Sequence, residues 1–202
     1  HLELQRYFDI HELLNPESAR RIYQRAGELL GSEAFSVRNM IREMNVEVIC
    51  TTDDPVDSLE HHQKIREDGF ETKVLPAWRP DKAMAVEDSD KYNQYIDSLE
   101  QASGTSISTF MDLLTALQSR HEFFHQMGCR ISDHGLEGFL AEEFDYLDIE
   151  KIFLKIRKGR NLNKQEIGRF KSAMLVELAV MDHEKGWTQQ FHVGAIRNNN
   201  SG

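Results

Sequence analysis

Four short strand-like runs constrain the fold of this chain most strongly, because each one is preceded by a helical segment. They are residues 46–50, 72–76, 129–132 and 187–192. Strands that alternate with helices favour a parallel sheet built from β/α units. The sequence therefore predicts an α/β fold with about four parallel strands.

Each predicted strand ends in a cluster of polar residues. The clusters are Thr51-Thr52-Asp53-Asp54, then Trp78-Arg79 with Asp81-Lys82, then Asp133-His134, and finally His192 with Arg197 and the asparagines 198–200. In a parallel barrel, the reacting groups lie at the C-terminal ends of the strands. We therefore look for the functional site in these four clusters.

Several of these residues also have a purely structural interpretation. Trp78 could belong to the core, and Asp133-His134 taken alone could be a helix cap beside a surface histidine. Arg79 at a strand end is a candidate for binding a planar anion through two parallel hydrogen bonds. Arg197 could do the same, or could pair with one of the many acidic side chains.

The helices follow from hydrophobic periodicity and from capping residues. We expect them at about residues 16–30, 36–44, 54–67, 89–102 and 106–127, from Asp148 to near Gly159, and from Asn163, with Glu166 completing a capping box, to Gly186. The resulting division is a mainly helical lead-in at 1–45, β/α units at 46–82, a helical insertion at 83–128, and barrel strands at 129–202 enclosing a second helical block at 135–186.

Residues 121–125, His-Glu-Phe-Phe-His, match the HExxH motif of zinc metalloproteases. On a helix the two histidines share one face, and Glu122 could act as a general base. The longer form of the motif has a histidine three residues after its glycine, where this chain has Ile131. We predict two partly exposed helix histidines, and keep a zinc metalloprotease as an alternative function.

Composition limits the partners of the chain. It has 24 Lys and Arg against 34 Asp and Glu, a net charge of -10, and no long basic run, which argues against nucleic acid. The longest apolar run, 173–181, is interrupted by Glu177 and is too short to span a membrane. Cys50 and Cys129 fit buried thiols in a reducing compartment, so we expect a cytoplasmic protein.

Long motifs resemble those of the uronate isomerase family, also called the glucuronate isomerase family, of the amidohydrolase superfamily. They are TTDDP at 51–55 with DSLEHH at 57–62, LPAWRPDK at 75–82, SDH at 132–134 and HVGAIRNNN at 192–200. The resemblance implies part of a distorted (β/α)8 TIM-like barrel with a large inserted helical region. It also implies an aldose–ketose isomerase that converts D-glucuronate to D-fructuronate and D-galacturonate to D-tagaturonate.

The resemblance also implies that the chain is an interior segment. The family's His-x-His pair of the first barrel strand and the metal-binding Asp of the last strand have no counterpart here, and the chain begins with His1 and no leader sequence. We therefore expect an excerpt without a complete active site. A non-catalytic helical interaction module is the second alternative function.

Site roles follow from the same resemblance. His134, His192 and Asp133 are the expected catalytic residues, and Arg79, Arg197 and Trp78 the expected substrate-binding residues. His134 is also the expected ligand of a divalent metal ion, with zinc as the candidate; the other ligands lie outside this chain, and the segment alone is expected to bind none. The expected partners are a small hexuronate and a second copy of the protein.

Overall fold

The computed structural model describes residues 1–138 and 140–194, which form two compact units. The first unit consists of residues 1–49 and 71–73. The second consists of residues 50–70 and the described part of residues 74–202. Each unit has its own helices and its own buried side chains.

The first unit is mainly helical and has a small core. It contains α1 (Leu2–Phe8), α2 (Ala19–Leu30), the short 3-10 helix η1 (Glu33–Phe35) and α3 (Val37–Glu43). Its only buried apolar side chains are Ile10 and Ile22. α1 was not expected from the sequence, because its N-cap residue, His1, makes no capping hydrogen bond from its side chain.

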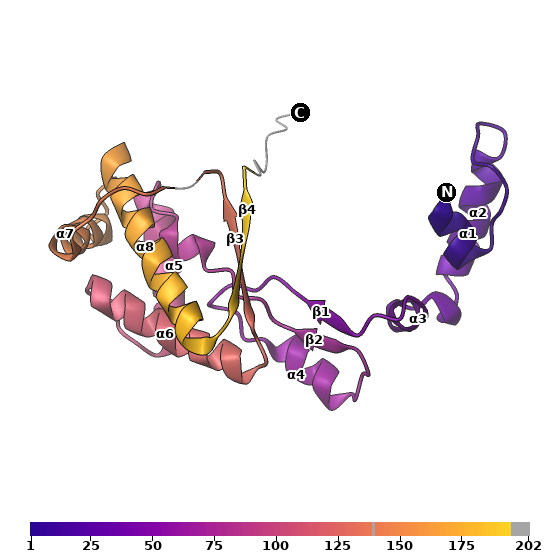
Figure 1. Ribbon diagram of the computed structural model, residues 1–202, viewed down its shortest axis with the longest axis horizontal. Coiled ribbons are helices and arrows are strands. Elements are labelled where there is room, and N and C mark those ends of the chain that lie inside the picture. The colour runs from indigo at the N-terminus through magenta and orange to yellow at the C-terminus, as the bar shows by residue number, and fades with distance from the viewer. Residues whose placement is uncertain (139, 195–202) are drawn as a thin grey trace. The chain divides into compact units, whose positions relative to one another are not determined.

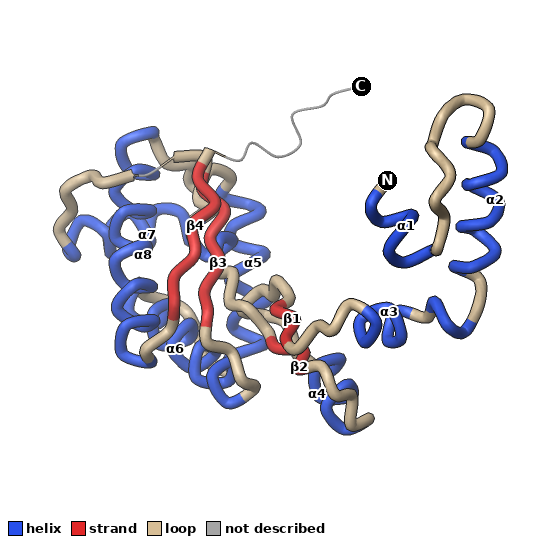
Figure 2. The backbone as a smooth tube through the Cα atoms, turned by 45° about the vertical axis from the view of Figure 1, so that its right-hand side comes forward, coloured by secondary structure: helices blue, strands red, loops and turns tan. Residues whose placement is uncertain are grey.

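The strands are β1 (Val48–Cys50), β2 (Lys73–Leu75), β3 (Ile131–Leu136) and β4 (Thr188–Val193). β3 and β4 lie side by side and pair in parallel along their whole length (Figure 2). Isolated parallel bridges join Trp78 to Asp53 on one side and to Ser132 on the other. The α/β fold with short parallel strands is therefore confirmed.

β3 is longer than the sequence predicts. The expected strand ended at Ser132, with Asp133 and His134 in the following loop, but β3 continues to Leu136. The reason is its partner: β4 pairs with it as far as Leu136↔Val193. Backbone pairing therefore extends beyond the apolar residues, and Asp133 and His134 lie within β3 rather than after it.

The second unit also contains helices, and those that follow residue 88 lie to one side of the β3–β4 pair (Figure 1). The helices of this unit are α4 (Glu60–Glu67), the 3-10 helix η2 (Asp81–Met84), α5 (Ser89–Ser103), α6 (Phe110–Gln126), α7 (Tyr146–Arg157) and α8 (Lys164–Lys185). No helix within residues 1–138 and 140–194 is both long and apolar enough to cross a membrane.

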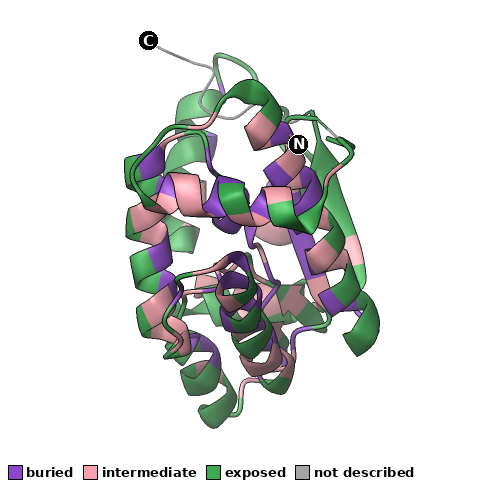
Figure 3. Ribbon diagram, turned by 90° about the vertical axis from the view of Figure 1, so that its left-hand side faces the viewer, coloured by how far each residue is buried: buried purple, intermediate pink, exposed green. Residues whose placement is uncertain are grey.

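Four aromatic rings from α5, α6, α7 and α8 form the centre of the helical core: Tyr92, Phe110, Phe153 and Phe170. Phe170 contacts the other three, with ring centroids 5.7 to 6.4 Å apart. Figure 3 shows buried segments alternating with exposed ones along these helices, as expected for elements that bury one face.

Four expected helix starts are wrong. α2 begins at Ala19 rather than at about residue 16, and α6 begins at Phe110, capped by Thr109, rather than at about residue 106. α4 begins at Glu60 rather than after Asp54, because the Asp57 carboxylate accepts the Asp54 N–H and holds these residues in a turn. α7 begins at Tyr146, with Asp145 rather than Asp148 as its cap. The capping box of Asn163 and Glu166 at the start of α8 is confirmed.

The two cysteines differ in exposure. Cys129 is buried, and burial raises the pKa of its thiol to about 11, so it stays protonated at neutral pH. Cys50 is exposed, which makes the expectation of two buried thiols wrong for this residue. Alternate side chains of a strand point to opposite faces, and in β1 Ile49 is the less exposed position.

We expect Phe170→Ala to lower the free energy of unfolding by about 3–5 kcal/mol, because it removes the ring that contacts the three other aromatics. Val180→Ala on the same helix is the matched control: Val180 is 46% exposed, so its change should stay within about 0.5 kcal/mol. Urea unfolding of the full chain measures both. Equal effects of the two substitutions would contradict this account of the core.

Candidate functional site

Three segments of the second unit bring Arg79, Asp133 and His192 together: the residues after β2, the interior of β3 and the last residues of β4. Arg79 Nε donates to the backbone carbonyl of Asp133 at 3.0 Å, and Arg79 Nη2 donates to the Asp133 carboxylate. On the other side, His192 Nδ1 lies 2.6 Å from Asp133 Oδ1. Asp133 therefore links an arginine that follows β2 to a histidine in β4.

The register of the strands produces this cluster. Trp78 bridges Ser132, so the next residues along each strand, Arg79 and Asp133, lie at the same level. Asp133 is paired with Gln190 in β4. His192 is two residues further on, and side chains two apart on a strand share a face. His192 can therefore reach back to Asp133.

Burial fixes one part of the cluster and leaves the other open. The side chains of Arg79 and Asp133 are 16% and 10% exposed, whereas that of His192 is 45% exposed. An arginine that donates twice to one partner holds it in a defined orientation. The cluster is thus a fixed ion pair beside an accessible imidazole, a side chain suited to general acid–base chemistry.

His134 is fully buried, yet neither of its ring nitrogens has a hydrogen-bond partner among the described residues. Its ring stacks on Phe191, with centroids 5.1 Å apart. Nδ1 lies 3.6 Å from Oδ1 of Asp81, an oxygen that also lacks a hydrogen bond. Unsatisfied buried polar atoms are costly, so this pair suits a ligand that would bind them.

Asp81 was not among the predicted site residues, although it lies in the polar cluster after β2. Its Oδ2 accepts the backbone N–H of Gly135 at 2.9 Å, which places its carboxylate beside β3. Imidazole and carboxylate are donors that suit a divalent cation. Within residues 1–138 and 140–194, however, no three His, Cys, Asp or Glu side chains gather closely enough to hold a metal ion. His134 and Asp81 could thus form only part of such a site.

Two predicted substrate-binding residues are not placed in the cluster. Trp78 is fully buried and packs edge-on against His121 and Phe124, which fits its interpretation as a core residue. Nothing in this geometry supports its expected contact with a substrate. Arg197 lies outside the described residues, together with the asparagines 198–200.

The polar residues after β1 are occupied by partners of their own. Asp54 accepts a hydrogen bond from the Tyr95 hydroxyl at 3.0 Å and lies 3.2 Å from Nζ of Lys82. Burial, and secondarily the Asp54 carboxylate, raise the pKa of Tyr95 well above its usual value. Tyr95 therefore remains a protonated donor that holds this carboxylate in place.

The HExxH residues do not form a metal site. His121 is only 2% exposed, its Nε2 lies 2.9 Å from Oδ1 of Asp182, and its ring stacks on Trp187. Glu122 pairs with Lys185, while His125 Nδ1 accepts the indole N–H of Trp187. The zinc metalloprotease alternative is therefore wrong. So is the expectation that His121 is partly exposed, because the helix face that carries it packs into the core.

Asp182 is a buried carboxylate that the sequence analysis did not single out. Besides His121, it accepts hydrogen bonds from Ser132 Oγ at 2.6 Å and Gln189 Nε2 at 2.9 Å. Ser132 and Gln189 are paired residues of β3 and β4. Asp182 thus joins β3 and β4 to α8. Its contact with β3 is made at Ser132, the residue before Asp133. A polar residue ending an apolar helical run was its only signal in the sequence.

Comparison with known proteins identifies the family. A family model described as glucuronate isomerase matches residues 1–202. A uronate isomerase of Bacteroides thetaiotaomicron is 54% identical over 201 residues, which cover 100% of this chain and 43% of that protein. One from Cellvibrio japonicus is 50% identical over 202 residues, covering 99% of this chain and 43% of that protein.

Solved structures agree. A uronate isomerase from Thermotoga maritima superposes with a TM-score of 0.90 at 35% identity, covering 98% of this chain and 43% of that one. For a glucuronate isomerase from Caulobacter crescentus the TM-score is 0.88 at 29% identity, covering 98% and 41%. The chain spans less than half the length of these relatives. Because the family model matches every residue, this chain belongs to the glucuronate isomerase family.

Proposed function

We propose that this chain supplies part of the active site of an aldose–ketose isomerase of hexuronates. The reactions are D-glucuronate to D-fructuronate and D-galacturonate to D-tagaturonate. The observation that carries the proposal is the cluster of Arg79, Asp133 and His192 in a chain that matches the family throughout. Since the chain spans 43% of the length of its curated relatives, the activity is proposed for the complete protein.

We propose that the strands belong to a distorted (β/α)8 barrel and that α5 to α8 form its inserted helical region. Two observations support this. The bridges of Trp78 and the pairing of β3 with β4 run in parallel order. The polar cluster lies toward the C-terminal ends of these strands, where barrel enzymes carry their reacting groups.

The anionic end of the substrate is assigned to Arg79. A uronate carries a carboxylate, which a fixed guanidinium can bind. Nε and Nη2 of Arg79 are engaged by Asp133, whereas Nη1 makes no hydrogen bond within residues 1–138 and 140–194. Nη1 is thus the donor left for the sugar carboxylate. Arg197 is kept as a second anion-binding residue.

The proton transfer is assigned to His192. Conversion of an aldose to a ketose moves a proton between C2 and C1 through an enediolate, and a positioned side chain accelerates such a transfer. Nδ1 of His192 lies against the Asp133 carboxylate, and its Nε2 lies 3.2 Å from Nε2 of Gln190. In the proposed reaction the sugar takes the place of Gln190 at this nitrogen. Asp133 would stabilise the imidazolium that forms when His192 takes up a proton.

We further propose that His134 is one ligand of a divalent metal ion, with zinc as the candidate. When bound, such an ion would act as a Lewis acid on the sugar carbonyl. The two unpaired nitrogens of His134 support this role, and the Asp81 carboxylate near its Nδ1 would orient the ring. The remaining ligands are expected outside this chain. The homo-oligomer and the cytoplasmic location also stay predictions.

Arg79→Ala in the full-length protein should lower kcat/KM for D-glucuronate about 30-fold or more, since losing charged hydrogen bonds costs about 2 kcal/mol. Arg79→Lys keeps the charge but cannot donate twice to Asp133 and also reach the sugar, so its kcat/KM should lie between those of Arg79→Ala and the parental protein. Arg20→Ala, at an exposed position of α2, is the control and should have no effect. An unchanged kcat/KM in Arg79→Ala would rule out the anion-binding role.

His134→Ala should reduce the metal content of the purified full-length protein and weaken its affinity for zinc at least 10-fold, because a direct ligand is lost. Equilibrium dialysis against zinc measures the affinity without any assay of activity. His183→Ala, at an exposed position of α8, should keep the parental value. Unchanged zinc affinity in His134→Ala would show that this residue contacts the sugar rather than a metal.

A further inference from the structure

His62 is a buried histidine outside the strand-end cluster. Its side chain is 8% exposed, whereas that of its neighbour His61 is 82% exposed. The two histidines are adjacent on a polar helix, and that composition predicts exposure of both. For His62 this is wrong, and a buried polar ring needs a structural or functional reason.

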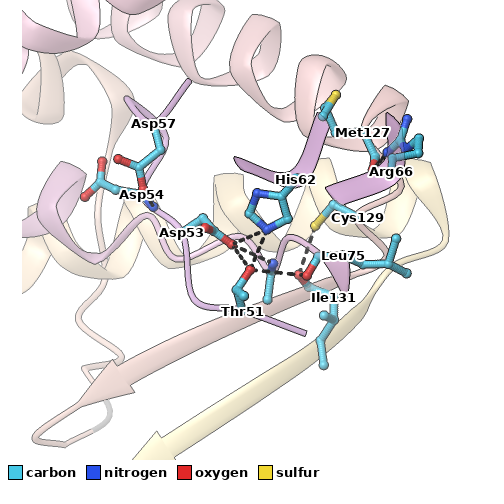
Figure 4. A network of polar contacts seen from close by, with 11 residues as sticks. Thr51, Asp53, Asp54, Asp57, His62, Arg66, Leu75, Met127, Cys129 and Ile131 are labelled. Carbon is cyan, nitrogen blue, oxygen red and sulfur yellow. Dashed lines mark hydrogen bonds and ion pairs between the residues drawn. The ribbon is translucent and has the colours of Figure 1, made fainter. Parts of the chain in front are cut away.

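The chain enters α4 through a strained residue. Leu59 has a φ of 56°, in the left-handed region that branched residues rarely adopt, and its side chain is buried. Its carbonyl accepts the N–H groups of His62 and Gln63. Such strain persists only where the surroundings fix it, and it concentrates at functional sites. Here the tight start of the helix directs His62 toward the end of β1 (Figure 4).

A directed pair of hydrogen bonds starts at His62. Its Nε2 lies 2.7 Å from Thr51 Oγ1, which lies 2.6 Å from Oδ2 of Asp53. Thr51 Oγ1 has two acceptors within reach, Oδ2 of Asp53 at 2.6 Å and the Leu75 carbonyl at 3.3 Å, and its single hydroxyl proton goes to the much nearer carboxylate. The hydroxyl oxygen must then accept from Nε2–H of His62. Figure 4 shows the imidazole, the hydroxyl and the carboxylate facing one another.

Asp53 in turn forms backbone hydrogen bonds with the residues on either side of Trp78, which are Ala77 and Arg79. Its N–H donates to the carbonyl of Ala77 at 2.9 Å, and its carbonyl accepts the N–H of Arg79 at 2.9 Å. Its Oδ2 accepts the N–H of Ala77 at 3.3 Å, so the oxygen that Thr51 orients also holds the β2 end. The backbone of Arg79 is thus fixed from Asp53, while its guanidinium is fixed from Asp133.

We propose that His62 is a positioning residue for Arg79, acting through Thr51 and Asp53. It does not touch the substrate; it sets the place from which Arg79 reaches the sugar carboxylate. The inference rests on the anion-binding role proposed above for Arg79. A displacement of about 1 Å at a binding group can cost about 100-fold in rate, so a buried contact that does not touch the substrate can still control its binding.

The first test compares three variants of the full-length protein. His62→Leu should raise KM for D-glucuronate about 10-fold or more, because the Asp53 carboxylate loses its orientation. His62→Gln should recover most of this loss, since its amide can donate near the position of Nε2. His61→Leu is the matched control, one residue away and exposed, and should leave KM unchanged.

A double-mutant cycle separates positioning from stability. If His62 acts through Arg79, His62→Leu should change kcat/KM less than about 2-fold in an Arg79→Ala background, because coupled residues are not additive. A lower melting temperature with kcat/KM unchanged in His62→Leu would overturn the inference and leave His62 a purely structural residue. So would an equal loss in both backgrounds.

Thr51→Val and Thr51→Ser test the same link if His62→Leu does not fold. Valine removes the hydroxyl at nearly constant volume and should reproduce the rise in KM, while serine keeps the hydroxyl and should restore the parental KM. Parental KM in Thr51→Val would overturn the inference. If Arg79→Ala itself has no effect, the proposed anion-binding role fails first; if only Arg79→Ala has an effect, the anion-binding role stands and the positioning role of His62 fails.

Discussion

Parallel backbone pairing through Trp78, from Asp53 on one side to Ser132 on the other, is the constraint on which the second unit depends. It places the residues that follow β1 and β2 beside β3 and β4, although long helical segments separate them in the chain. Because successive side chains alternate between faces, one register fixes which groups meet. The same pairing buries the Trp78 ring and brings Arg79 to Asp133.

Features that depend on local sequence were predictable. The alternation of strands and helices and the capping box at Asn163 follow from neighbouring residues, and both are observed. Strand ends were less predictable, because β3 stops where its partner β4 stops. The start of α4 was missed for a related reason: a turn after Asp54 and the left-handed Leu59 delay the helix, and neither has a clear pattern in the sequence.

The residues of the candidate site were likewise predictable only in part. Polar residues at predicted strand ends pointed to Asp133 and His192, which the structure brings together. The interpretation of His121 failed because its partner, Asp182, is 61 residues away in the chain. Burial of a polar side chain depends on such distant partners, so a polar helix or a five-residue motif cannot reveal it. The family motifs indicated which part of the chain carries the site, whereas the contacts between its side chains could be found only from the fold.

The ring nitrogens of His134, which have no hydrogen-bond partner among residues 1–138 and 140–194, have a thermodynamic consequence. A buried imidazole without hydrogen bonds makes the folded chain less stable than it would be with those atoms satisfied. Any species that binds them in the folded state, and not in the unfolded chain, shifts the folding equilibrium by mass action, by about 2.7 kcal/mol at 100 times its dissociation constant. If the metal ion proposed above binds His134, its binding and the resistance of the chain to unfolding are coupled through this one ring.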